Sequence, residues 1–152
     1  MADTHLYPVT VKWSGGRDGT GIVTANRTGI DNALSVPTEF GGPGTGTNPE
    51  ELLTSAIAAC YSITFGIVAS ARKLNYVSIR TDAVGEVEQP NAATFLYNKI
   101  TLKPTITLPE DADEAAHALA EDLAHKADAY CIVTNAVRGK VAIEVVPTIV
   151  KG

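Results

Sequence analysis

Two cysteines, Cys60 and Cys131, are the most reactive side chains among the 152 residues of this chain. Cys60 lies in the small and apolar segment AIAACYSITF, which favours a thiol packed inside a helix. Cys131 follows the tripeptide DAY, at the expected junction of a second helix and a loop. Each cysteine alone is compatible with an inert core thiol, but a pair in a chain with no other cysteine raises the alternative of a redox couple.

A thiol acts as a nucleophile in its thiolate form, so a reactive cysteine needs a cation or hydrogen-bond donors that lower its pKa from about 8.5. Arg17 is the best candidate cation, because it lies in the glycine-rich turn SGGRDG. The alternative is a solvated arginine in a turn. Glu50 could orient the guanidinium by a bidentate contact, and the alternative is a capping box with Thr47 at the start of a helix.

Three histidines, His5, His117 and His125, are the remaining candidate metal ligands. A zinc site normally uses four ligands, and neither a C-x-x-C nor an H-x-x-x-H spacing supplies them. We therefore expect no metal site.

The composition is that of a compact globular protein, with 45% hydrophobic and 19% charged residues. The net charge of −5 and the lack of a basic stretch argue against nucleic-acid binding, which needs clustered Lys and Arg. The amino terminus, MADTHLYPVTVKW, does not resemble a secretory signal, which predicts a cytoplasmic protein. The uncharged segment from Leu52 to Ala71 approaches the hydropathy of a membrane span. Because it is rich in small and hydroxylated residues and would divide one globular unit, we interpret it as a helix buried in the fold, without membrane contact.

The elements expected to position these side chains begin with strands over Tyr7–Trp13 and Thr20–Asn26, which form a hairpin. A glycine-rich loop, Phe40–Thr47, leads to a helix that starts with Thr47 as N-cap and runs to about Leu74, with Asn75 as exit residue.

The second half of the chain predicts two long strands, another helix and a closing strand. The strands are Val77–Val87 and Thr94–Leu108, around a turn at Gln89–Asn91. The helix covers Pro109–Ala129, and the closing strand covers Lys140–Val146. This order predicts one α+β domain, residues 1–152, whose central helix is covered by sheet.

Three separated segments resemble the signature of the OsmC/Ohr family, the osmotically inducible and organic hydroperoxide resistance proteins. Gly44–Ser62, GTGTNPEELLTSAIAACYS, is similar to the family run in which a GTNPE turn precedes the peroxidatic cysteine. The turn SGGRDG resembles the TGGREG turn of the Ohr branch. The run CIVTNAVRG, which starts at Cys131, resembles C-P-Y-S-N-A-x-R-G, which contains the family's resolving cysteine.

Two departures from the family pattern bear on the chemistry. Ile132 and Val133 replace the proline and tyrosine that usually follow the second cysteine, and Glu39 stands where the OsmC branch carries its arginine. Only the Ohr-type arginine is present, which favours Ohr-like chemistry. Asn135 and Arg138 match the run, and we expect them to hold the turn rather than to act in catalysis.

The resemblance implies antiparallel sheets wrapped around a long buried central helix, in an intertwined homodimer. It also implies a thiol peroxidase that reduces organic hydroperoxides to alcohols without a cofactor. Cys60 would be peroxidatic and Cys131 resolving, with Arg17 and Glu50 in the same site. An external dithiol, of the lipoylated type, would reduce the resulting disulfide.

The spacing of two of these residues adds a geometric constraint. In a continuous helix, Glu50 and Cys60 would lie about 15 Å apart along the axis, which one side chain cannot bridge. We therefore expect a two-fold dimer with shared sites, each combining the thiols of one chain with Arg17 and Glu50 of the other. The alternative functions are a non-catalytic protein that binds a hydrophobic ligand or senses redox state, and a stress protein whose thiols only pack.

Overall fold

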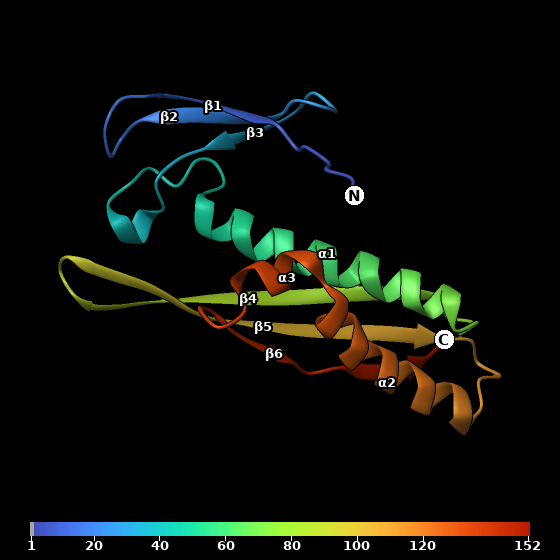
Figure 1. The fold of residues 1–152 in the computed structure, drawn as a ribbon. Coiled ribbons are helices and arrows are strands. Elements are labelled where there is room, and N and C mark those ends of the chain that lie inside the picture. Colours follow the sequence, from blue (N-terminus) through green and yellow to red (C-terminus); the bar gives the residue numbers. More distant parts are fainter. Residues whose placement is uncertain (1) are drawn as a thin grey trace. The chain divides into compact units, whose positions relative to one another are not determined.

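The computed structural model describes residues 2–152, and the chain divides into two compact units between Leu52 and Leu53. Unit 1 ends at Leu52 and contains a small sheet (Figure 1). Unit 2, Leu53–Gly152, contains a larger sheet and most of the helical residues. Each unit is described by itself.

Unit 1 is built on a three-stranded antiparallel sheet in the order β1-β2-β3. β1 (Val9–Ser14) and β2 (Thr20–Ala25) form the expected hairpin, which brings the SGGRDG turn to its tip. β3 (Ile30–Leu34) was not predicted, because Asp31 and Asn32 are residue types that are depleted in strands. A short 3-10 helix, Thr38–Phe40, then opens the glycine-rich loop.

The helix α1 (Pro49–Ala71) begins one residue later than the sequence predicts. Asn48, rather than Thr47, is the N-cap, since its side-chain oxygen accepts the Glu51 N–H at 2.8 Å. The Asn48 side-chain amide in turn donates to the Glu51 carboxylate at 2.7 Å, so Glu51 takes the capping role expected of Glu50. Asn is as good an N-cap as Ser or Thr, and it leaves Pro49 at the first helical position, where a missing N–H has no consequence.

At its other end α1 stops earlier than the predicted exit at Asn75. Lys73 takes the left-handed conformation with φ 57°, and the Leu74 N–H donates to the Ala69 carbonyl at 2.8 Å. This is a Schellman termination in which a lysine occupies the position usually given to glycine. It satisfies carbonyls of the last turn that would otherwise lack partners.

The sheet of unit 2 is mixed, which differs from the predicted wholly antiparallel arrangement. β4 (Ser78–Asn91) and β5 (Thr94–Leu108) form a long antiparallel hairpin, as expected. β6 (Ala142–Val145) and β7 (Thr148–Lys151) pair in parallel with successive stretches of β5. The chain returns to β5 through helices, and a helical crossover connects parallel strands.

Two helices precede this return, α2 (Glu114–Tyr130) and α3 (Ile132–Val137). α2 is capped by Asp113, whose carboxylate accepts the Ala116 N–H at 2.8 Å. Figure 1 shows the helices of unit 2 gathered along the β4–β5 hairpin. The core between these elements consists mainly of fully buried apolar side chains: Ile57, Tyr61, Phe65, Ala69, Ile100, Leu102, Ile106, Leu108, Ala120, Leu123, Ala124 and Ala127.

By length and composition, α1 is the one helix among residues 2–152 that could span a membrane, with a mean hydropathy of 1.8. One of its faces nevertheless packs in the core of unit 2, where the buried Tyr61 hydroxyl donates to the Ala124 carbonyl at 2.6 Å. The expectation of a buried central helix therefore holds for this face. On the opposite face, Ile63 and Ile67 are 64% and 63% exposed within the single chain.

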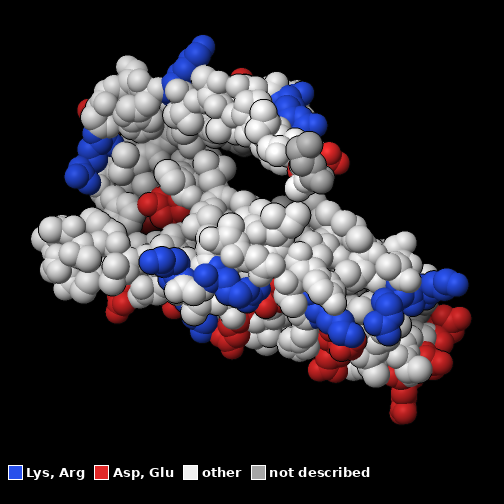
Figure 2. Space-filling view, in the orientation of Figure 1, with Lys and Arg blue, Asp and Glu red and all other residues white. Residues whose placement is uncertain are grey.

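Charged side chains of both signs alternate over the surface of unit 2. Lys99 pairs with Glu144 at 2.6 Å and Lys126 with Asp122 at 2.9 Å. Figure 2 shows basic and acidic side chains next to one another along the part of unit 2 that faces the viewer. On that face no broad basic patch of the kind that binds nucleic acid is visible.

Candidate active site

Cys60 lies near the middle of α1, in the stretch that carries the buried core residues, and it is half-buried. Its neighbour Tyr61 fixes this turn against α2 through the hydrogen bond to Ala124. One helical turn further on, the Thr64 hydroxyl lies 4.0 Å from Cys60 Sγ, a long contact for a hydrogen bond to sulfur. The helix thus holds the thiol in a fixed orientation with one hydroxyl beside it.

Cys131 occupies the single residue between α2 and α3, and it is 0% exposed. Its extended backbone, φ −71° and ψ 114°, ends the first helix and caps the second. Its sulfur accepts the Thr134 N–H at 3.5 Å, so the thiol itself serves as the N-cap of α3. The sharp change of direction at one residue explains how a cysteine at a helix end becomes deeply buried.

The side chains of Asn135 and Arg138 hold this junction together. Asn135 donates to the Ala129 carbonyl at 3.0 Å, and Arg138 donates to Asn135 at 2.9 Å and to the Asp128 carbonyl at 3.0 Å. Arg138 also forms an ion pair with the Asp128 carboxylate at 3.4 Å. The structural role that the sequence predicts for Asn135 and Arg138 agrees with these contacts.

The two thiols perturb each other's protonation. Burial raises the pKa of Cys60, but hydrogen bonds from the Cys131 thiol, the Val133 and Ile132 N–H groups and the Thr64 hydroxyl outweigh it, so the pKa of Cys60 is lowered. Burial and the hydrogen bond to Cys60 raise the pKa of Cys131. The proton of the pair is therefore held on Cys131, and Cys60 is the thiol that ionises first.

This arrangement has the chemistry of a nucleophilic sulfur beside a second, protonated sulfur. Both cysteines are reduced in the structure. A thiolate at Cys60 is supported by N–H groups from the start of α3, a helix that the sequence did not predict. Its signal was hidden because IVTNAV contains β-branched residues, which favour strands.

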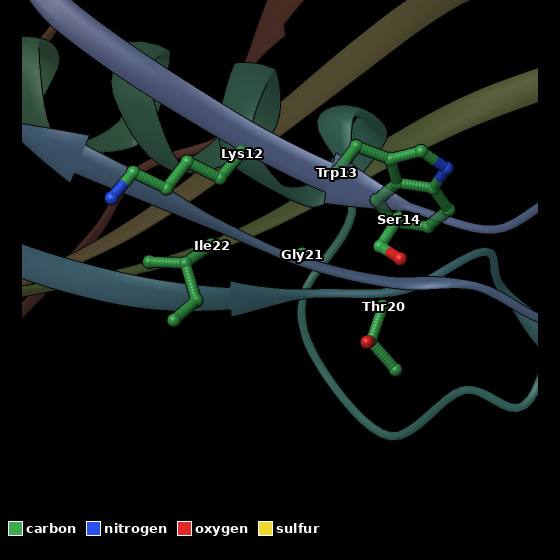
Figure 3. Close-up of a pocket in the computed structure, with 6 residues that line it drawn as sticks. All are labelled: Lys12, Trp13, Ser14, Thr20, Gly21 and Ile22. Atoms are coloured by element: carbon green, nitrogen blue, oxygen red, sulfur yellow. The ribbon is translucent and has the colours of Figure 1, made fainter.

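Arg17 lies in unit 1, in the turn between β1 and β2, where its guanidinium donates to the Phe40 carbonyl. A Cβ on Gly41 would come within 3.0 Å of the Arg17 side chain, so this glycine lets the loop pass close to the arginine. Figure 3 shows Ser14 and Thr20, the last pair of the hairpin, beside a shallow depression of about 380 Å³ on the two strands. The depression is lined by strand residues and does not include Arg17.

Glu50 also lies in unit 1, in the first turn of α1, and it is half-buried. Because Glu51 completes the capping box, capping does not explain the glutamate at position 50. α1 has no break between Glu50 and Cys60. The two side chains are therefore separated by about 15 Å along the helix axis, the condition under which a shared dimeric site was expected.

The three histidines are exposed on the surface of their units. Among residues 2–152, no group of three or more His, Cys, Asp or Glu side chains is placed to hold a metal ion.

Comparisons with known proteins agree with the fold and with the family resemblance. The model of the OsmC-like protein family matches residues 42–146. The uncharacterized protein YmaD of Bacillus subtilis is 33% identical over 144 residues, which cover 95% of this chain and 93% of that protein. An organic hydroperoxide resistance protein of Xanthomonas axonopodis pv. citri is 32% identical over 142 residues, covering 91% of this chain and 92% of that protein.

A solved structure gives the same result at the level of the fold. The crystal structure of an organic hydroperoxide resistance protein OsmC from Legionella pneumophila has a TM-score of 0.74 at 27% identity, and covers 95% of this chain and 99% of that chain. The α+β class and the family resemblance predicted from the sequence are thereby confirmed. The chain belongs to the OsmC family.

Proposed function

We propose that the protein is a thiol peroxidase that reduces organic hydroperoxides to alcohols, with Cys60 as the peroxidatic and Cys131 as the resolving cysteine. The observation that carries the proposal is the thiol pair of unit 2, in which the pKa of Cys60 is lowered and Cys131 is a hydrogen-bond donor to it. Relatives named for organic hydroperoxide resistance support the choice of substrate class.

The reaction proceeds in three steps. The Cys60 thiolate attacks the outer oxygen of the hydroperoxide, the O–O bond breaks, and the alkoxide leaves and takes a proton to become the alcohol. Cys60 is then a sulfenic acid, which condenses with the Cys131 thiol to form a disulfide and water. A dithiol of the lipoyl type reduces this disulfide, and its own two thiols become a disulfide.

Arg17 and Glu50 complete the proposed site. The guanidinium stabilises the Cys60 thiolate and the negative charge that develops on the leaving oxygen, and the carboxylate orients the guanidinium. The protein acts as a cytoplasmic homodimer, a single domain over residues 1–152, in which these two residues come from the partner chain. The exposed apolar side chains Ile63 and Ile67 on α1 support an assembly that covers this face.

Replacement of each cysteine tests the proposal. Cys60→Ser should abolish consumption of cumene hydroperoxide, because the nucleophile is lost. Cys131→Ala should allow one round of reduction and then stall or over-oxidise at Cys60, because nothing traps the sulfenic acid. Full turnover by Cys60→Ser would refute the assignment.

A further inference from the structure

Near the thiol pair, the hydroxyl group of Thr134 is buried without a hydrogen bond to any of the residues that the structure describes. The residue is 0% exposed, and among residues 2–152 its hydroxyl has no hydrogen-bond partner. A buried polar group without a partner costs free energy, so its retention needs a physical reason. The nearest reactive group is Cys131, three residues earlier, whose sulfur accepts the Thr134 N–H at 3.5 Å.

Thr134 acts on this sulfur through two groups. Burial and the neighbouring Cys60 raise the pKa of Cys131, whereas the side chain and the backbone N–H of Thr134 both lower it. The hydroxyl therefore lies close enough to the sulfur to lower its pKa, although among residues 2–152 it meets the geometry of a hydrogen bond with no partner. Once Cys60 is bonded to another sulfur, it no longer accepts a hydrogen bond from the Cys131 thiol, so this contribution to the raised pKa of Cys131 is removed.

The two sulfurs differ in access. Cys60 is half-buried, whereas Cys131 is 0% exposed. A thiolate that attacks a disulfide bonds to one sulfur and expels the other as a thiolate. Attack by an external reductant is therefore directed to Cys60, and the charge then appears on the buried Cys131, where a thiolate needs hydrogen-bond donors.

We propose that Thr134 is the donor that stabilises Cys131 as the leaving thiolate when an external dithiol attacks the disulfide at Cys60. This inference rests on the proposed function and specifies its last step. The attacking thiolate forms a bond to Cys60 Sγ, the Cys60–Cys131 bond breaks, and its electron pair remains on Cys131 Sγ. The second thiol of the reductant then attacks the reductant's own bonded sulfur, closes a cyclic disulfide, and releases Cys60 as a thiolate.

Thr64 provides a matched control, because its hydroxyl lies beside the other sulfur, 4.0 Å from Cys60 Sγ. If the reductant attacked Cys131 instead, Cys60 would be the leaving group, and Thr64 rather than Thr134 would stabilise it. Substitution of each threonine by valine keeps the shape and removes the hydroxyl. The two variants therefore separate the two directions of attack.

The experiment oxidises each protein with one equivalent of cumene hydroperoxide and follows its reduction by dithiothreitol in a stopped-flow instrument. Thr134→Val should slow reduction by about tenfold or more, as expected for loss of a hydrogen bond to a charged group. Thr134→Ser should restore the rate. At dithiothreitol concentrations low enough for the first attack to limit the rate, Thr64→Val should be reduced as fast as the wild type, because Cys60 leaves only in the later intramolecular step. Equal rates for Thr134→Val and wild type, or a slow Thr64→Val, would overturn the inference.

A second measurement uses the wild-type protein and so does not depend on the folding of a variant. The oxidised protein is mixed with 2-mercaptoethanol, quenched with acid and mapped by peptide mass spectrometry. The adduct should be found on the Cys60 peptide, and an adduct on the Cys131 peptide would contradict the inference. If the wild type forms no disulfide at all, the proposed function fails together with this inference, whereas a normal disulfide attacked at Cys131 overturns the inference alone.

Discussion

At Cys60, burial and hydrogen bonding act on the thiol in opposite directions. Burial raises its pKa, and donors from Cys131, from α3 and from Thr64 lower it by more. The thiolate, which is the form that attacks a peroxide, is therefore more populated near neutral pH than in an unperturbed cysteine. Because Cys131 makes the largest lowering contribution, the effect can be tested at that residue.

We expect the rate of Cys60 oxidation by cumene hydroperoxide to rise with pH and then to level off. The midpoint of this rise should lie at a pH below the pKa of an ordinary cysteine. Above its lowered pKa the thiol is already ionised, so a further increase in pH adds no thiolate. Cys131→Ala removes a donor to this thiolate, and the midpoint should move to higher pH. Single-turnover oxidation rates of both proteins across the pH range measure the shift, and superimposable profiles would contradict the role given to Cys131.

The residues of the proposed site could be predicted from the sequence to different degrees. Cys60, Cys131, Arg17 and Glu50 stand in runs whose residue types and spacing resemble a family signature. Thr134 could not be found in this way, because its importance depends on complete burial and on its place in a helix that begins at Cys131. Neither property is visible in a run of β-branched residues.

At the scale of elements, the start of α1 shows how a shift of one residue changes the interpretation of a side chain. With Thr47 as N-cap, Glu50 would complete the capping box, and its presence would need no other reason. With Asn48 as N-cap, Glu51 completes the box instead. Helix capping therefore does not account for Glu50, in agreement with the role in the site that we propose.

We expect Asn48→Ala to lower the free energy of unfolding by about 1 kcal/mol, because the Glu51 N–H loses its side-chain acceptor. Thr47→Ala is the matched control, and it should have a smaller effect, since Thr47 does not cap the helix. Urea denaturation followed by circular dichroism measures both. A larger loss for Thr47→Ala would mean that the cap lies where the sequence alone places it.

The elements with strong local signals could be predicted from the sequence. The first hairpin, α1, the β4–β5 hairpin and α2 all have regular apolar spacing or clear caps. β3, α3 and β7 were missed, since each has six residues or fewer and is specified by its partners rather than by its own pattern. The parallel pairing of β6 and β7 with β5 likewise depends on the path of the chain through α2 and α3.

At the scale of the whole molecule, the proposed chemistry needs residues from both units. The thiol pair belongs to unit 2, and Arg17 and Glu50 belong to unit 1. The uninterrupted helix from Glu50 to Cys60 separates the two side chains along one chain by about 15 Å. A two-fold dimer resolves this separation if each site takes the thiols from one chain and the other two residues from its partner.

Mixing of two inactive variants tests this shared site. Cys60→Ser and Arg17→Ala should each lose most of the peroxidase activity as pure proteins. In a mixed dimer formed by refolding them together, one site combines an intact Cys60 with an intact Arg17 from the partner chain, so part of the activity should return. A mixture as inactive as its components, with exchange of chains confirmed by native mass spectrometry, would place each site within a single chain.

The most direct test of the account follows the two sulfurs through one oxidation. The reduced protein is treated with one equivalent of cumene hydroperoxide, alkylated without reductant, and analysed by intact mass and peptide mapping. We predict the loss of two hydrogen atoms, a peptide in which Cys60 is linked to Cys131, and one equivalent of cumyl alcohol. Thiols that remain free and alkylated while the hydroperoxide persists would contradict the claim that this pair is a peroxidase centre.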